Sequence, residues 1–96
     1  MGIPLRAGSN PEIITVNADT WTKIFSGVNL AKITNLYNEI DILYLTYVKE
    51  GDPAPTDLLI PKWKVPAGYA AFNGANARYD IYAYPEKEDL EIRLEA

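Results

Sequence analysis

Short apolar runs, each closed by a turn, recur along this chain at intervals of about 8 to 12 residues. The runs are rich in β-branched and aromatic side chains, which pack well on a pleated surface. Strands are therefore favoured over helices throughout. The sequence predicts an all-β protein with no helix and no internal repeat.

Seven or eight short strands follow from this pattern, with glycine, proline, asparagine and aspartate in the breaks. Ser26-Gly27 is expected to end the second strand, and Asn73-Gly74 predicts a hairpin between the two strands beside it. The expected strands are Glu12–Asn17, Thr20–Phe25, Leu30–Leu36, Asp41–Lys49, Leu58–Val65, Tyr69–Phe72, Ala77–Tyr84 and Leu90–Glu95.

The length of 96 residues, with 48% apolar and 23% charged residues, suits one folded domain. We expect residues 12–96 to form a two-layer antiparallel β-sandwich with Greek-key or jelly-roll connections. A five-stranded oligonucleotide-binding barrel is the alternative fold. Residues 1–11 have no periodicity and contain two glycines and two prolines, so we expect an irregular arm that lies on a neighbouring chain or frays.

Cysteine and histidine are both absent from the sequence. Disulfides, thiolate or imidazole metal sites, cysteine nucleophiles and histidine relays are thereby excluded. Carboxylates are plentiful, but those at outward strand positions, such as Glu91 and Glu95, are typical of solvated surface rather than of a glycosidase pair. We expect no enzymatic activity, no cofactor and no metal.

The net charge of −4 is concentrated at the end of the chain, where five acids and two bases follow Pro85. The nearly neutral body offers no basic surface for a polyphosphate, so nucleic acid is not an expected partner. The longest apolar run, Ile42–Leu45, is far shorter than the roughly 20 residues of a membrane span. No secretory signal is recognised, so we expect synthesis in the cytosol and no membrane contact.

The predicted strand Asp41–Lys49 is apolar on both faces, which indicates cover on both sides. We expect Ile42, Tyr44 and Val48 to fill the interior. The opposite face would then point outward, where either the N-terminal arm or another protein chain would cover it, and we favour another chain. The expected protein interface therefore consists of Leu43, Leu45 and Tyr47, with Tyr82 and Tyr84 on a neighbouring strand.

Seven tyrosines and two tryptophans allow a second interpretation. Carbohydrate-binding modules present aromatic rings as platforms for sugars, whereas rings in most proteins pack in cores and interfaces. An alternative function is therefore recognition of surface glycans. The candidate platform residues are Trp21, Trp63, Tyr69 and Tyr82.

Several stretches of the chain resemble small structural proteins of tailed bacteriophage particles, of the head-decoration, head-fibre or collar type. These stretches are Ile14–Ile24, Ala31–Asn35, Pro66–Gly68, Asp80–Tyr84 and Leu90–Leu94. The resemblance implies a β-sandwich without catalytic residues that is made in the host cytoplasm and located in the virion. It also implies a homo-oligomer, with a trimer favoured, that lies against the major capsid protein or another virion protein. The leading function is stabilisation of a viral shell.

Overall fold

The computed structural model describes residues 3–36, 43–56, 63–65 and 68–96. These residues form eight strands and no helix, so none of them belongs to a helix that could cross a bilayer. The strands are β1 (Glu12–Val16), β2 (Thr22–Val28), β3 (Leu30–Asn35), β4 (Leu43–Lys49), β5 (Trp63–Val65), β6 (Gly68–Asn73), β7 (Tyr79–Pro85) and β8 (Leu90–Glu95).

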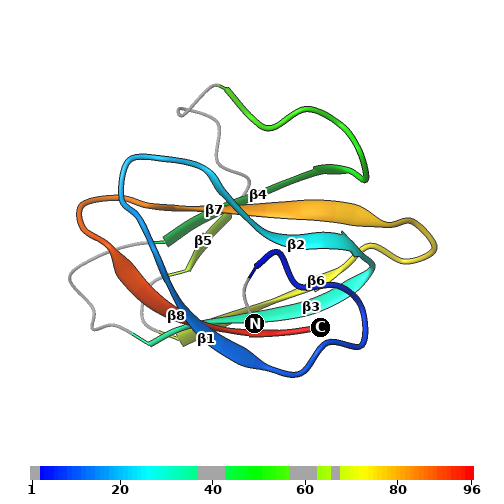
Figure 1. Ribbon diagram of the computed structural model, residues 1–96, viewed down its shortest axis with the longest axis horizontal. Helices are drawn as coiled ribbons and strands as arrows, with labels where there is room; N and C mark the ends of the chain where they lie inside the picture. Colours follow the sequence, from blue (N-terminus) through cyan, green and yellow to red (C-terminus); the bar gives the residue numbers. More distant parts are fainter. Residues whose placement is uncertain (1–2, 37–42, 57–62, 66–67) are drawn as a thin grey trace.

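The strands lie in two antiparallel sheets that face each other (Figure 1). One sheet has the order β1-β8-β3-β6, and the other has the order β2-β7-β4-β5. The first strand thus pairs with the last, the second with the seventh, the third with the sixth and the fourth with the fifth. This nesting is the jelly-roll arrangement. The predicted two-layer sandwich is confirmed, and the five-stranded barrel is wrong.

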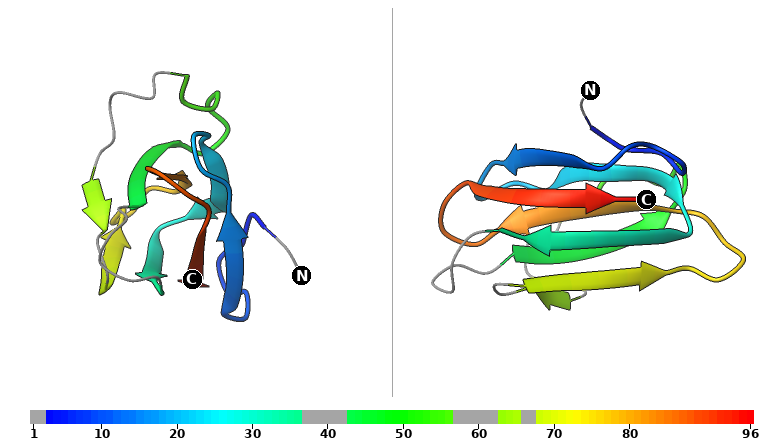
Figure 2. Two further views of the ribbon diagram at one scale, coloured as in Figure 1. Left: turned by 90° about the vertical axis from the view of Figure 1, so that its left-hand side faces the viewer. Right: turned by 90° about the horizontal axis from the view of Figure 1, so that it is seen from below.

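The core lies between the sheets, whose strands run along the long dimension of the molecule (Figure 2). Alternation along β8 produces its share of the core, because Leu90, Ile92 and Leu94 are fully buried while Glu91 and Arg93 are exposed. β7 contributes Ile81 and Ala83, and its residues Asp80 and Tyr82 are buried as well. The other buried apolar residues are Leu5, Val16, Ile24, Phe25, Val28, Ala31, Ile33, Leu43, Leu45, Val65 and Phe72.

Two local predictions are wrong. β2 continues through Ser26-Gly27, because Gly27 adopts a φ of 65° and the strand absorbs extra residues as irregularities in its pairing with β7. The Asn73-Gly74 connection does not form a hairpin. Its two strands belong to different sheets, since β6 pairs with β3 whereas β7 pairs with β2 and β4.

The faces of β4 are the reverse of those expected. Leu43 and Leu45 point into the core and are 0% exposed. Cross-strand partners share a face of a sheet, and Leu45 lies opposite Ala83, which is also fully buried. Tyr44 points to the other side, where its hydroxyl donates a hydrogen bond to Glu86. Placing the tyrosine outward leaves its polar group satisfied, which placing it in the core would not.

Part of the predicted arm belongs to the sandwich. Leu5 is 2% exposed, its N–H donates to the Ile24 carbonyl at 2.9 Å, and its own carbonyl accepts from the Ser26 N–H at 2.8 Å. The arm therefore covers the outer edge of β2 in its own chain. Ile42, most of the predicted strand Leu58–Val65 and the turn at Pro66 lie outside the described residues.

Candidate functional site

Four exposed apolar side chains are distributed over the outer face of the β1-β8-β3-β6 sheet. Ile13 and Leu30 are each 58% exposed, and Tyr69 is 66% exposed. Leu36 continues the outward alternation of β3, and its N–H donates to the Glu91 carbonyl in β8. These four residues define the exposed face. They are four of the five large apolar side chains that are exposed in the described part of the chain.

The polar residues of the exposed face carry both signs of charge. The Lys32 ammonium lies 4.7 Å from the centre of the Tyr69 ring, a distance suited to a cation–π contact. Arg93 and Glu95 form an ion pair of 3.8 Å. A face of mixed charge with apolar patches suits contact with another protein better than contact with a polyanion.

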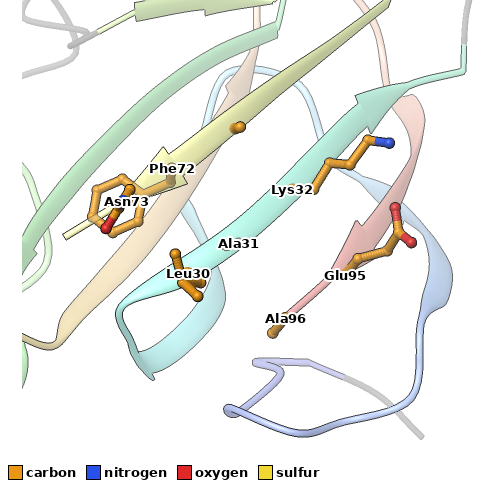
Figure 3. Close-up of a pocket in the computed structure, with 8 residues that line it drawn as sticks. Leu30, Ala31, Lys32, Phe72, Asn73, Glu95 and Ala96 are labelled. Atoms are coloured by element: carbon orange, nitrogen blue, oxygen red, sulfur yellow. The ribbon is translucent and has the colours of Figure 1, made fainter. Parts of the chain in front are cut away.

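A hollow of about 460 Å³ lies at one end of this face. Leu30 and Lys32 of β3, Ala71 and Asn73 of β6, and the chain end at Glu95 and Ala96 surround it (Figure 3). The hollow is shallow and open to solvent.

Four aromatic rings form a second cluster where the edge strands β5 and β6 of the two sheets meet. We call Tyr47, Trp63, Phe72 and Tyr79 the edge cluster. Trp63 and Phe72 are stacked with centroids 6.1 Å apart, and Tyr47 lies 5.3 Å from Phe72 and 5.2 Å from Tyr79. A hollow of about 290 Å³ opens here, lined by Tyr47, Trp63 and residues 70–73 of β6.

Three half-buried rings cross the outer face of the other sheet. We call Trp21, Tyr84 and Tyr44 the ring row. The centroids of Trp21 and Tyr84 are 5.3 Å apart, and those of Tyr84 and Tyr44 are 6.4 Å apart. Carboxylates flank the row, because the Tyr84 hydroxyl donates to Asp19 at 3.4 Å and the Tyr44 hydroxyl donates to Glu86 at 3.3 Å.

The surroundings of Tyr84 favour its neutral form. Burial raises the pKa of the Tyr84 hydroxyl above its ordinary value of 10.0. The nearby charge of Asp19, the hydrogen bond to that carboxylate and the charge of Glu86 raise this pKa further. Beside it, the buried Trp21 Nε1–H has no hydrogen-bond partner among the described residues. The ring row thus places two carboxylates next to aromatic surface.

The residues of the expected interface do not share one surface. Leu43 and Leu45 are in the core, and Tyr82 is 4% exposed, so the prediction that these three face a partner is wrong. Tyr47 is at the surface but belongs to the edge cluster, and Tyr84 belongs to the ring row. For Leu43 and Leu45 the error arises because alternation shows that a strand has two apolar faces but does not show which one points inward. Tyr82 lies on the same side of β7 as Tyr84, as expected, but is covered there.

The four predicted glycan-platform residues do not form one platform. Trp21 and Tyr82 are associated with the β2-β7-β4-β5 sheet, Trp63 lies in the edge cluster, and Tyr69 lies on the exposed face of the other sheet. The exposed face itself was missed. Its members are not direct neighbours, because Arg93 and Thr34 lie between Ile13 and Tyr69, and only the strand register shows that they share one face of the sheet.

Within the described residues, no group of aspartate or glutamate side chains could hold a metal ion. The buried carboxylate of Asp80 is fully engaged in structure. It accepts the N–H of Gly27 at 2.9 Å and that of Gly51 at 3.2 Å, and it lies 3.4 Å from the Lys23 ammonium.

Comparison with protein-family models, curated proteins and solved structures gives no match. The resemblance to bacteriophage structural proteins stays a prediction.

Proposed function

We propose that this chain is a non-enzymatic structural protein of a virus particle that docks on a capsid protein or another virion protein through the exposed face. The observation that carries the proposal is that four of the five large apolar side chains exposed in the described part of the chain, Ile13, Leu30, Leu36 and Tyr69, share one outer sheet surface. Each of these side chains would gain free energy on burial, at about 25 cal/mol per Å² of apolar area. Several large apolar side chains exposed on one sheet face are candidate contacts for another protein chain.

The fold and the resemblance supply the choice of partner. Eight-stranded jelly rolls recur in viral capsid proteins, although they also occur in lectins and cupins. The stretches that resemble bacteriophage structural proteins include Ile14–Ile24 and Leu90–Leu94. These stretches contain parts of β1 and β8, which belong to the sheet that carries the exposed face. Localisation in the virion and assembly with further copies of the chain belong to the same proposal.

Sedimentation of particles from the virus that encodes the chain tests this function. We expect the wild-type protein to co-sediment with the particles and Ile13→Glu to remain in the unbound fraction, because a carboxylate would then be buried at the contact. Thr56→Glu is the matched control, since it adds the same charge at an exposed position away from the sheets. Wild-type protein that never sediments with particles, or Ile13→Glu protein that still does, contradicts the proposal.

A second candidate function is recognition of a glycan at the ring row. It is favoured by the adjacency of Trp21, Tyr84 and Tyr44 to two carboxylates, because rings stack on sugar faces and carboxylates accept sugar hydroxyls. We expect tryptophan fluorescence to change on addition of maltohexaose, cellohexaose or chitohexaose. Tyr84→Ala should abolish the change and Trp63→Phe should preserve it. An unchanged spectrum with all three sugars contradicts this candidate.

A further inference from the structure

The four outer strands of the sandwich differ in how their free edges are protected. β2 is covered by Leu5, and β5 is only three residues long and carries Lys64. β1 follows Pro11 and begins with Glu12. These are devices by which proteins prevent strands from pairing with another chain. β6 has none of them: its six residues include no charge and no proline.

In the described part of the chain, the backbone groups at the free edge of β6 have no partner. The Gly74 N–H donates to the Asn29 carbonyl at 2.8 Å, on the side of β3. Because successive residues of a strand direct their backbone groups to opposite sides, those of Tyr69, Ala71 and Asn73 point away from β3. No described residue bonds to these backbone groups.

We propose that β6 pairs with β6 of a second copy, antiparallel and about a two-fold axis at Ala71. The sequence of β6 is complementary to itself in this register. Ala71 lies opposite Ala71 of the second copy, the bulky Phe72 lies opposite Ala70, and Tyr69 lies opposite Asn73. Every large ring thus meets a smaller side chain, and the backbone groups of Tyr69, Ala71 and Asn73 complete a hydrogen-bonded ladder.

The hollows on both sides of β6 match this pairing. Side chains of an added strand alternate between the two faces of the sheet. Tyr69 of the second copy would lie beside Asn73, at the hollow of about 460 Å³ that Leu30 also lines. Phe72 of the second copy would lie beside Ala70, at the hollow of about 290 Å³ lined by Tyr47 and Trp63.

The pair would form one continuous sheet through two chains, with both exposed faces on the same side. This inference deepens the proposed function and rests on it, because it assumes that the chain acts as a subunit of an assembly. Two joined docking faces would bind a symmetric particle more tightly than one, because the second contact becomes intramolecular.

Light scattering coupled to size-exclusion chromatography tests the pairing over a dilution series. We expect twice the mass of one chain for the wild type and for Thr15→Lys, which places a charge on the other edge strand of the same sheet. Ala71→Lys should halve the mass while leaving the circular dichroism spectrum unchanged. A wild-type monomer, a trimer, or a dimer that survives Ala71→Lys would overturn the inference.

A single introduced cysteine gives an independent readout, because the chain has none of its own. Directly opposed Cα atoms in a hydrogen-bonded pair are about 5.5 Å apart, which a disulfide can span. Oxidation should therefore link Ala71→Cys into a dimer and leave Thr15→Cys monomeric; equal linking of both would count against the register.

If Ala71→Lys is monomeric but still sediments with particles, the edge pairing and the docking function are shown to be separate. If wild-type protein is dimeric but binds no particle, only the docking function fails.

Discussion

Asp80 joins three segments of the chain at one buried carboxylate. Two backbone N–H groups, of Gly27 and Gly51, and the Lys23 ammonium surround its oxygens. Hydrogen bonds to a charged group are stronger than neutral ones, and the donors would be left unsatisfied without it.

Asp80→Ala should lower the free energy of unfolding by about 2–3 kcal/mol, because it removes these charged hydrogen bonds. Urea denaturation measures the loss. Asp52→Ala is the control, because Asp52 is exposed and follows Gly51 in the segment after β4. Its effect on the free energy of unfolding should stay within about 0.5 kcal/mol. Equal losses in the two variants would contradict the role of Asp80.

The raised pKa of Tyr84 makes folding stability depend on pH in the alkaline range. The folded protein holds this proton more tightly than the unfolded chain, so the contribution is complete below the unfolded value of about 10 and is lost as pH rises through the folded value. Stability of the wild type should therefore fall more steeply above pH 10 than that of Tyr84→Phe. Urea midpoints between pH 8 and pH 11 measure this; parallel curves would contradict it.

Leu45 and Leu30 distinguish the core from the exposed face. Leu45→Ala should destabilise the protein by about 2–5 kcal/mol, because it leaves a cavity between the sheets. Leu30→Ala removes the same atoms from a side chain that is largely in solvent, and should cost far less. Thermal or urea unfolding checks both. A small loss of stability in Leu45→Ala would mean that Leu45 faces outward, as the sequence alone predicts.

At the scale of elements, the strands themselves could be predicted, because β-branched runs and turn residues are local signals. Seven of the predicted strands begin or end within a few residues of β1 to β4 and β6 to β8, whereas most of the range predicted around β5 is not described. The path of β2 through Gly27 and the separation of β6 from β7 could not be predicted. Both depend on which distant strand each element meets.

The arm is an element whose role depends on one side chain. Leu5→Ala should lower stability by about 2 kcal/mol and loosen the cover on β2, because Leu5 packs against the core. Leu36→Ala is the control at a side chain that is 44% exposed. Faster amide exchange of Ser26, which donates to Leu5, would accompany the loss. Unchanged exchange and stability would show that the arm is not bound.

At the scale of the molecule, the sandwich could be predicted but its functional surfaces could not. Length, composition and strand number indicate two layers. The exposed face, however, exists because β1, β8, β3 and β6 are neighbours in one sheet. Nothing in the sequence indicates that these four strands pair in that order. Tyr44 joins the ring row only because β4 presents its leucines to the core.

The last strand completes the whole fold. β8 lies between β1 and β3 and buries Leu90, Ile92 and Leu94. A chain ending at Asp89 should therefore show no cooperative urea transition, whereas a chain ending at Glu95, which lacks only the exposed Ala96, should unfold like the full chain. Circular dichroism measures both. Cooperative unfolding of the shorter chain would mean that β1 finds another partner.

The pairing of β1 with β8 also sets how the molecule would respond to tension. Glu12 lies opposite Leu94, so the start of the first strand and the end of the last lie at the same end of one ladder. A force applied through the two ends would, once the arm has peeled away, open this ladder one rung at a time like a zipper instead of loading all rungs together. Such a subunit would resist strain poorly when pulled by its ends and much better when held across the broad surface of its sheet.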